Sequence, residues 1–254
     1  MLVLERVESV EARNSADWCE HFNRNELRQL EVPWDELMPL TDEQRAVLPP
    51  SLQDFQLGES SEGRHGRARA RAYADHIGDQ HYAEAIRLFF AEENRHAAYL
   101  ARYLRKQDVE LLGRSWTDFV FRRVRRLMGL ELLLTVLLTA ELIGEVYYRA
   151  IRAATKCPTL RAICAQLLRD ERMHVRFHVE RFQFLRRRRS GIRTRIQDAG
   201  WRVFFSATSL VVWWKHGSAM QLGGYSFRRF RDEVMQGWRR AVRESYRQPS
   251  SSSR

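Results

Sequence analysis

The sequence predicts an all-α protein built around a four-helix bundle. After Pro50, apolar residues recur at alternating steps of three and four, which places them on one face of a helix. No long stretch alternates apolar and polar residues as a strand does, and no repeat of the solenoid type occurs. Turn signals near residues 78 and 157 divide the helical pattern into two long hairpins, the arrangement from which a four-helix bundle is made.

The first hairpin is predicted to join helices over 51–77 and 80–107, with Gly78 at the turn. The residues before it, 1–50, are polar and interrupted by prolines. They are interpreted as an N-terminal extension that ends at Pro50, because proline disrupts helical hydrogen bonding.

The second hairpin is predicted to join helices over 115–155 and 159–189. A start resembling a capping box at Ser115 begins the third helix. The pair Cys157 and Pro158 separates the third helix from the fourth.

Residues 190–254 are predicted to form a basic helical extension after the bundle, which itself spans 51–189. The chain has a net charge of +11, and residues 181–254 alone hold 17 basic and four acidic side chains. Such a surface fits nucleic acid, anionic lipid or an acidic protein. Forty arginines against three lysines indicate a GC-rich codon bias, so nucleic-acid binding is not predicted. The apolar stretch 204–214 fits three roles: covering the bundle, forming a homodimer contact, or lying against a membrane surface.

The cysteines and the apolar segments favour a cytoplasmic protein. Three cysteines with no CxxC pair argue against a disulfide framework. The first fifteen residues carry acids and no uninterrupted apolar run, unlike a secretory signal. Glu131 and Glu141 interrupt the most apolar stretch, 127–143, before it reaches membrane-spanning length, so no transmembrane segment is expected.

Two Glu-x-x-His motifs lie on faces that are predicted to be buried. Glu93 and His96, and likewise Glu171 and His174, are three residues apart and share one face of a helix. The same face carries the apolar stripe of each helix. Because a carboxylate and an imidazole are costly to bury without partners, the repeated motif indicates a functional site.

The register of the two hairpins places one further glutamate level with each motif. In an antiparallel hairpin, the numbers of two residues at the same level add up to twice the number of the turn. Glu62 is level with the first motif for a turn near Gly78, and Glu141 is level with the second for a turn near Cys157. Four carboxylates and two imidazoles are therefore expected to meet inside the bundle.

Bound metal ions would compensate this set of buried acidic groups. Carboxylates and neutral imidazoles suit iron or manganese, and bridging carboxylates suit two ions about 3.5–4 Å apart. No cysteine joins the set, which argues against structural zinc and against an iron–sulfur cluster. The alternative is that the acids form only buried salt bridges with the many arginines, which is disfavoured because such pairs add little stability.

The residues resemble the ferritin-like di-iron carboxylate proteins, over residues 50–185. The resemblance rests on Glu62, ENRH ending at His96, Glu141, and ERMH ending at His174. The stretch LGESSEG, followed by a helix with EE-x-RH, is also similar to a bacterial group of ferritin-like proteins. The resemblance implies two iron ions, or one manganese and one iron. It further implies bridging carboxylates at Glu93 and Glu171, one imidazole per ion from His96 and His174, and terminal carboxylates from Glu62 and Glu141.

Three neighbouring residues are alternative ligands or hydrogen-bond partners of the ligands. Glu59 and Glu145 lie one helical turn from Glu62 and Glu141, and register favours the latter two. His178 lies one turn after the second motif and fits either an additional ligand or a core histidine.

Other polar residues near the motifs are predicted to have structural roles. Glu92 is interpreted as a solvated neighbour on the helix surface. The tyrosines at positions 99, 103, 147 and 148 are predicted to pack or to donate hydrogen bonds.

Three functions are compatible with such a site. The first is a di-iron oxidoreductase, a monooxygenase or oxidase, that uses dioxygen and an external electron donor to oxidise a small organic substrate. The second is iron handling, as in a ferroxidase, a storage protein or a rubrerythrin-like peroxide scavenger. The third is a non-enzymatic interaction module that uses the basic C-terminal region.

The first function is the one that we predict. The chain has long segments at both ends, unlike the compact bundles of cage ferritins, and it lacks the cysteine-rich domain that rubrerythrin-like proteins often carry. An apolar substrate is expected because leucines from the third helix would line one side of the site, at positions 130, 134, 137 and 138.

Overall fold

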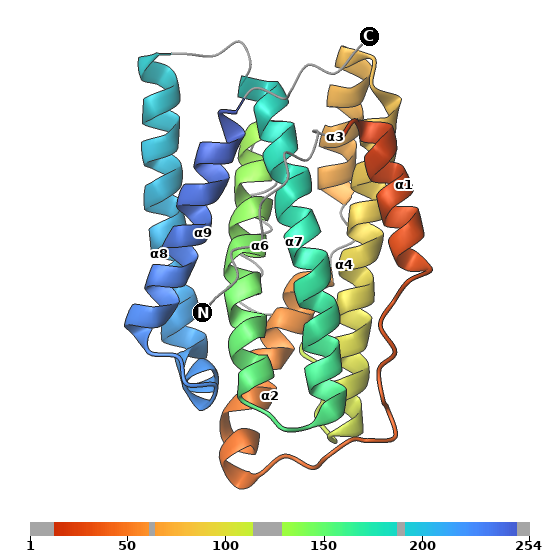
Figure 1. Ribbon diagram of the computed structural model, residues 1–254, viewed down its shortest axis with the longest axis vertical. Helices are drawn as coiled ribbons and strands as arrows, with labels where there is room; N and C mark the ends of the chain where they lie inside the picture. Colours follow the sequence, from red (N-terminus) through yellow and green to blue (C-terminus); the bar gives the residue numbers. More distant parts are fainter. Residues whose placement is uncertain (1–12, 61–63, 114–128, 187–190, 248–254) are drawn as a thin grey trace, which may run out of the picture.

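The computed structural model describes residues 13–60, 64–113, 129–186 and 191–247, and within these ranges every regular element is a helix. The prediction of an all-α protein is confirmed. The helices lie side by side along the long axis of the molecule (Figure 1). No helix in the described ranges combines the length and the apolar character needed to cross a membrane. The helices are α1 (Ser15–Glu26), α2 (Asp42–Glu59), α3 (Arg64–Ile77), α4 (Gln80–Lys106), α6 (Leu130–Ala153), α7 (Pro158–Arg186), α8 (Ile192–Leu222) and α9 (Phe227–Ser245).

The first predicted helix differs from the structure at its start and in its continuity. The helix α2 begins at Asp42, where Thr41 and Gln44 form a capping box, and it passes through the proline pair that was expected to precede it. Leu48 and Leu52 on either side of the prolines are fully buried, so packing outweighs the lost backbone hydrogen bonds. The expected continuous helix over 51–77 is instead divided between α2 and α3.

The other three predicted helices agree with the structure in the ranges that it describes. The helix α4 ends one residue before its predicted end, and α7 starts one residue before its predicted start. The third predicted helix corresponds to α6, and its first part, 115–128, lies outside the described residues. Asp79 caps α4 by accepting a hydrogen bond from the backbone N–H of Tyr82, which fixes the turn after α3.

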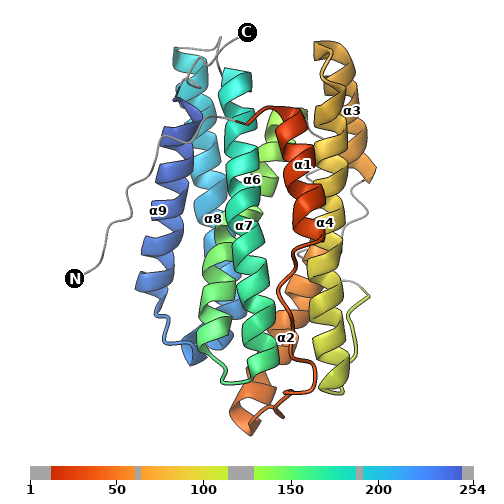
Figure 2. The same cartoon turned by 45° about the vertical axis from the view of Figure 1, so that its right-hand side comes forward.

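The C-terminal helices belong to the same hydrophobic core as the helices that precede them. Figure 2 shows α8 and α9 beside α6 and α7, with α1 against α4 on the other side. Trp201 and Phe205 of α8 and Phe230 of α9 are buried in one core cluster with α6 residues such as Tyr147. The Trp201 indole also donates a hydrogen bond to the Thr139 hydroxyl. The inner face of the stretch 204–214 therefore packs against the preceding helices, as one of its three predicted roles requires.

The turn between α8 and α9 depends on a glycine that touches α6. A Cβ atom added at Gly223 would collide with the carbonyl group of Ala150. We expect Gly223→Ala to lower the free energy of unfolding by about 1–3 kcal/mol, because backbone atoms must move. Gly200, an exposed position within α8 with open space around it, is the matched control. Gly200→Ala should raise the free energy of unfolding by about 0.5–1 kcal/mol. Urea denaturation of both variants measures the difference, and equal effects would contradict the described packing.

Candidate metal centre

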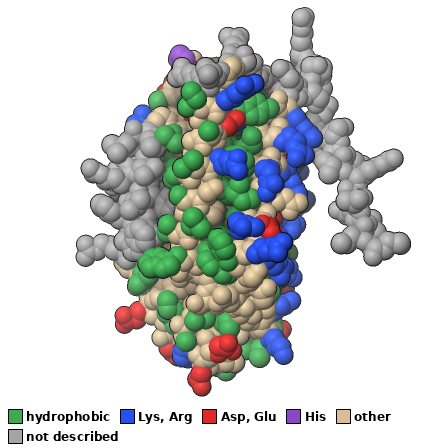
Figure 3. Space-filling model, turned by 90° about the vertical axis from the view of Figure 1, so that its left-hand side faces the viewer, with side chains coloured by type: hydrophobic (Ala, Val, Ile, Leu, Met, Phe, Trp, Pro, Cys, Tyr) green, Lys and Arg blue, Asp and Glu red, His purple; other side chains and the backbone are tan. Residues whose placement is uncertain are grey.

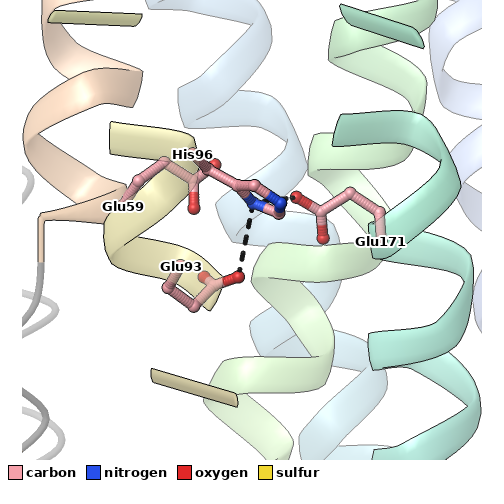
Figure 4. A group of neighbouring side chains, drawn as sticks. All are labelled: Glu59, Glu93, His96 and Glu171. Carbon is pink, nitrogen blue, oxygen red and sulfur yellow. Dashed lines mark ion pairs between the residues drawn. The ribbon is translucent and has the colours of Figure 1, made fainter. Parts of the chain in front are cut away.

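Four helices bring six acidic and imidazole side chains together inside the molecule. They form two groups of four, and in each group the potential ligand atoms all lie within 4.8 Å of one another. Glu93 and Glu171 belong to both groups. Figure 4 shows the three carboxylates of the first group gathered around the His96 imidazole. The first group is Glu59, Glu93, His96 and Glu171, and the second is Glu93, Glu141, Glu171 and His174.

Five of the six residues that were predicted as ligands are in this cluster. The sixth, Glu62, lies outside the described residues. Glu59, the last residue of α2 and one of the alternatives considered from the sequence, lies in the group that contains His96. Tyr148 of α6 donates a hydrogen bond of 2.5 Å to Glu59, which fixes this carboxylate at the end of its helix.

Both imidazoles present the Nδ1 atom to the carboxylates. His96 Nδ1 lies 3.6 Å from Glu93 Oε1 and 3.7 Å from Glu171 Oε1. His174 Nδ1 lies 3.1 Å from Glu93 Oε1, 3.5 Å from Glu171 Oε2 and 3.6 Å from Glu141 Oε2. Neither Nδ1 atom has a hydrogen-bond partner, and both are buried. The atoms that would face a metal ion are thus left unpaired by the protein itself.

The opposite ring nitrogen of each histidine is held by a buried carboxylate from the facing helix. His96 Nε2 lies 3.0 Å from Asp170 Oδ2, and His174 Nε2 lies 3.1 Å from Glu92 Oε2. Glu92 is fully buried, so its interpretation as a solvated surface residue was wrong. The sequence carries a signal for this arrangement, because each Glu-x-x-His motif is preceded by an acidic residue.

An asparagine from α1 links the two outer carboxylates. Asn25 Nδ2 donates hydrogen bonds of 2.5 Å to Glu92 and 2.8 Å to Asp170. Gln166 donates a further hydrogen bond of 2.6 Å to Asp170, and Arg95 donates one of 3.0 Å to Glu92. Although burial raises the pKa of Asp170, its hydrogen bond with His96 and the charge of that ring lower the pKa to about 2. The pKa of Glu92 is also lowered, because the bond with His174 outweighs burial.

The hydrogen bonds of the two Nε2 atoms to Asp170 and Glu92 determine which imidazole nitrogen is free to bind a metal. Because an ionised carboxylate only accepts hydrogen bonds, Nε2 of each ring carries the proton. A neutral ring then has its lone pair on Nδ1, directed at the oxygens of Glu93 and Glu171, which also carry lone pairs. A cation or additional protons must therefore lie between these atoms. The donor set, with unpaired nitrogen and oxygen atoms around a common centre, fits two metal ions.

Burial and mutual repulsion have a large effect on the inner carboxylates. Burial, followed by the charges of Glu93 and Glu171, raises the pKa of Glu59 well above its usual range. Burial and the neighbouring Glu141 do the same to the pKa of Glu171. Without metal, protons are expected to remain on part of the cluster at neutral pH.

The two remaining alternatives from the sequence lie at or beyond the edge of the cluster. Glu145 pairs with Arg149 at 3.0 Å and belongs to neither group of potential ligands. His178 is fully buried, and its Nε2 atom lies 3.9 Å from Glu141 Oε1. Burial and the neighbouring His174 lower the pKa of His178 to about 3, so the ring is neutral at physiological pH.

The tyrosines beside the cluster have the structural roles that were predicted for them. Besides the bond from Tyr148 to Glu59, the Tyr147 hydroxyl lies 2.8 Å from the Ser51 hydroxyl, with which it shares a hydrogen bond.

Comparison of the chain with protein-family models, with curated proteins and with solved structures gives no match. The chemistry of the site therefore rests on its own residues.

Proposed function

We propose that the chain is a di-iron enzyme of the ferritin-like type that activates dioxygen to oxidise a small, apolar organic substrate. The sharing of Glu93 and Glu171 by two groups of potential ligands carries this proposal. A carboxylate has two oxygens and can bind one ion with each, so a shared pair suits a bridged dinuclear centre. The remaining ligands would be Glu59 and His96 for one ion, and Glu141 and His174 for the other.

The distribution of these residues over the helices supports a ferritin-like arrangement. The helices α2 and α6 each supply one glutamate, and α4 and α7 each supply a Glu-x-x-His motif. This is the ligand pattern of di-iron four-helix bundles. In this interpretation, α2 with α3, α4, α6 and α7 form the bundle, and the other helices are additions to it.

The protein's own residues would orient the ligands and restrict water at the centre. When bound, two iron ions supply the redox chemistry that reduces dioxygen and oxidises a substrate. Glu92 and Asp170 hold the imidazoles by Nε2, so that both Nδ1 atoms stay directed inward. Phe89 lies against the His174 ring, with ring centres 4.8 Å apart, and forms an apolar wall on that side. One manganese and one iron ion would suit the same donors.

Reaction of the iron-loaded protein with oxygen tests the proposed function. Anaerobic protein that is supplied with ferrous iron should bind about two ions per chain, as a dinuclear site requires. Oxygen should then oxidise only this bound iron. With an external reductant and a set of small apolar compounds, mass spectrometry should detect an oxygenated or desaturated product.

Iron storage predicts a different result in the same experiment. A storage protein would continue to take up ferrous iron under oxygen and would deposit many ions per chain. Uptake far beyond two ions would overturn the proposed oxidase or oxygenase function, although the ligand assignment would remain. Absence of iron binding would overturn both.

The assignment of Glu59 can be tested separately. We expect Glu59→Gln to weaken iron binding by at least about tenfold, because an amide binds iron more weakly than a carboxylate and partners of metal ligands alone contribute about 10–100-fold. Glu145→Gln is the matched control and should retain its iron, since this side chain is paired with Arg149. Glu62→Gln tests the residue that register favoured. Iron content by mass spectrometry decides among them, and loss in Glu145→Gln with retention in Glu59→Gln would contradict the assignment.

A further inference from the structure

The outward face of α8 carries a stripe of large apolar side chains. Ile196, Val203, Leu210 and Trp214 are 55–78% exposed. Their spacing of seven, seven and four places them on one face of the helix, opposite the buried Trp201 and Phe205. The stripe covers about 27 Å along the helix. Isolated exposed apolar residues are ordinary on a protein surface, but a continuous stripe of this length indicates an interaction site.

The neighbouring helix α9 has a basic outward face. Arg228, Arg239 and Arg243 are exposed, and their positions along the helix place them opposite the buried residues Phe230 and Val234. Figure 3 views the molecule from the side of α8 and α9, and it shows hydrophobic side chains running down this face with a column of lysine and arginine beside them. Arg228 pairs with the exposed Asp232 at 3.8 Å. No carboxylate among the described residues pairs with Arg243.

The two helices are held side by side, so the apolar and basic faces form one surface. The Trp213 ring of α8 packs against the rings of Phe227 and Phe230, with ring centres 5.6 Å apart in each case. At the other end, Trp201 packs against Trp238. Residues 192–247 hold eleven basic and four acidic side chains, so this surface belongs to a region of strong positive charge.

We propose that the outward faces of α8 and α9 dock the protein on an anionic lipid membrane. The apolar stripe of α8 would enter the boundary between headgroups and acyl chains, with the Trp214 ring at that level. The arginines of α9 would contact lipid phosphates, for which the guanidinium group is well suited. Both helices would lie parallel to the membrane plane. This surface shares no residue with the metal centre, so the proposal does not depend on the proposed function.

Charge complementarity favours a lipid surface over other occupants. A second copy of the chain would bring the same positive charge to the interface, whereas anionic lipid supplies the opposite charge. Nucleic acid would satisfy the arginines but would leave Val203, Leu210 and Trp214 without an apolar partner. A membrane of anionic lipid satisfies both halves of the surface.

Vesicle flotation with the full chain tests the proposal. The protein should bind vesicles of phosphatidylglycerol and phosphatidylcholine, and should bind vesicles of phosphatidylcholine alone much more weakly. Arg239→Gln/Arg243→Gln should reduce partitioning by about 25-fold at low salt, since each arginine near an anionic surface contributes about fivefold. Arg105→Gln/Lys106→Gln on α4 makes the same change of charge at exposed positions elsewhere and should have little effect.

The apolar stripe needs its own variants. Leu210→Ser/Trp214→Ser should reduce partitioning by at least about tenfold, because buried apolar area contributes to interfacial binding. Leu27→Ser, at an 87% exposed position at the end of α1, is the control. Tryptophan emission should shift to shorter wavelength on binding, and Trp214→Phe should bind but show a smaller shift. All these positions are exposed, so the fold should be retained.

Several results would overturn the proposal. One is equal binding of both vesicle types, and another is wild-type partitioning in the Leu210→Ser/Trp214→Ser variant. A stable dimer in sedimentation equilibrium that dissociates in this variant, together with no binding to vesicles, would assign the surface to a second copy. Binding of an oligonucleotide that is unchanged by the same variant, with no binding to vesicles, would assign the arginines to nucleic acid.

Discussion

Iron binding is expected to be almost abolished in the His96→Ala/His174→Ala variant. Each imidazole directs an unpaired Nδ1 atom at the shared carboxylates, and the variant removes the nitrogen ligand from both groups. Loss of a residue that only orients a metal ligand costs about 10–100-fold in affinity, so loss of two ligands should cost considerably more. Iron content should fall below about a tenth of the wild-type value at equal ferrous iron concentration.

The variant should remain folded, because the carboxylates behind the two rings keep other partners. Asp170 still accepts hydrogen bonds from Asn25 and Gln166, and Glu92 still accepts them from Asn25 and Arg95. Circular dichroism should therefore show wild-type helix content. A loss of iron accompanied by unfolding would not support the assignment, whereas loss from a folded chain would.

His178→Ala is the matched control for the double histidine variant. His178 is as deeply buried as His174 and lies one helical turn further along α7, but it belongs to neither group of potential ligands. We expect it to retain its iron. Full iron occupancy in the double variant would contradict the assignment of His96 and His174 as ligands. Loss of iron in His178→Ala would also contradict the assignment and would indicate that His178 is a ligand.

The second hairpin shows why part of the cluster could be predicted from the sequence alone. The apolar periodicity of α6 and α7 is uninterrupted, so residue numbers translate directly into position along this pair of helices. The register therefore placed Glu141 level with Glu171 and His174, and the structure brings these three together. For this hairpin, the local periodicity and one well-defined turn were sufficient to predict which side chains meet.

In the first hairpin, the register calculation rests on a continuous helix that the structure does not contain. The register that favoured Glu62 requires one continuous helix over 51–77. The structure ends α2 at Glu59, with Ser60 as its C-cap, and it describes α3 over Arg64–Ile77. Numbering before this break no longer reports depth along α3. The start of α2 was missed for a related reason, since buried packing on both sides of a proline pair cannot be seen in a local pattern.

Asn25 could not be predicted from any local pattern. It lies 67 residues from Glu92 and 145 residues from Asp170, and its part in the centre depends on the docking of α1 against α4. A single asparagine in a short polar helix has many possible roles. In contrast to Asn25, Glu92 and Asp170 could be predicted from the sequence, because an acidic residue directly precedes each of the two Glu-x-x-His motifs. Comparing the two motifs residue by residue would have identified them.

Without metal, the protein is expected to lose stability as the pH rises from 7 to 9. Burial and neighbouring carboxylates raise the pKa of Glu59 and Glu171 well above the value of 4.5 for an exposed side chain. Burial lowers the pKa of His174, but the carboxylates that surround the ring raise it more, to well above 6.5. Above pH 7 the unfolded chain has released these protons, whereas the folded chain releases its own only as the pH passes the raised pKa values.

The sign of the effect follows from proton linkage. A state that binds more protons becomes less favourable as the pH rises, so the folded state loses stability until the raised pKa values are passed. Each proton that only the folded state retains costs about 1.4 kcal/mol for every pH unit over which it is retained. Asp170 has a pKa of about 2 and His178 of about 3, so neither changes its charge in this range.

Urea denaturation in the presence of a chelator measures the loss. Glu59→Gln removes one of the mutually repelling carboxyls and should make the loss smaller. Glu145→Gln, which changes a carboxylate outside the cluster, should leave the loss of stability unchanged.

Cys164 is a second source of stability loss with rising pH, because burial raises the pKa of its thiol from 9.0 to about 12. The difference between the two glutamate variants separates the cluster from this cysteine. A metal-free protein whose unfolding free energy is constant or rises between pH 7 and 9 would show that the cluster holds no extra protons.

Bound metal should reverse this dependence on pH. An ion replaces the protons that the carboxylates and imidazoles share, so its binding releases protons and becomes stronger as the pH rises. Stabilisation by a ligand grows with the ratio of its free concentration to its dissociation constant, so the iron-loaded protein should lose no stability from pH 7 to 9. Calorimetric titration with ferrous iron under anaerobic conditions, in buffers of different ionisation enthalpy, should show proton release in wild-type protein and less in Glu59→Gln. Iron binding without proton release would mean that the cluster is already fully ionised in the metal-free protein, which the close approach of its buried carboxylates argues against.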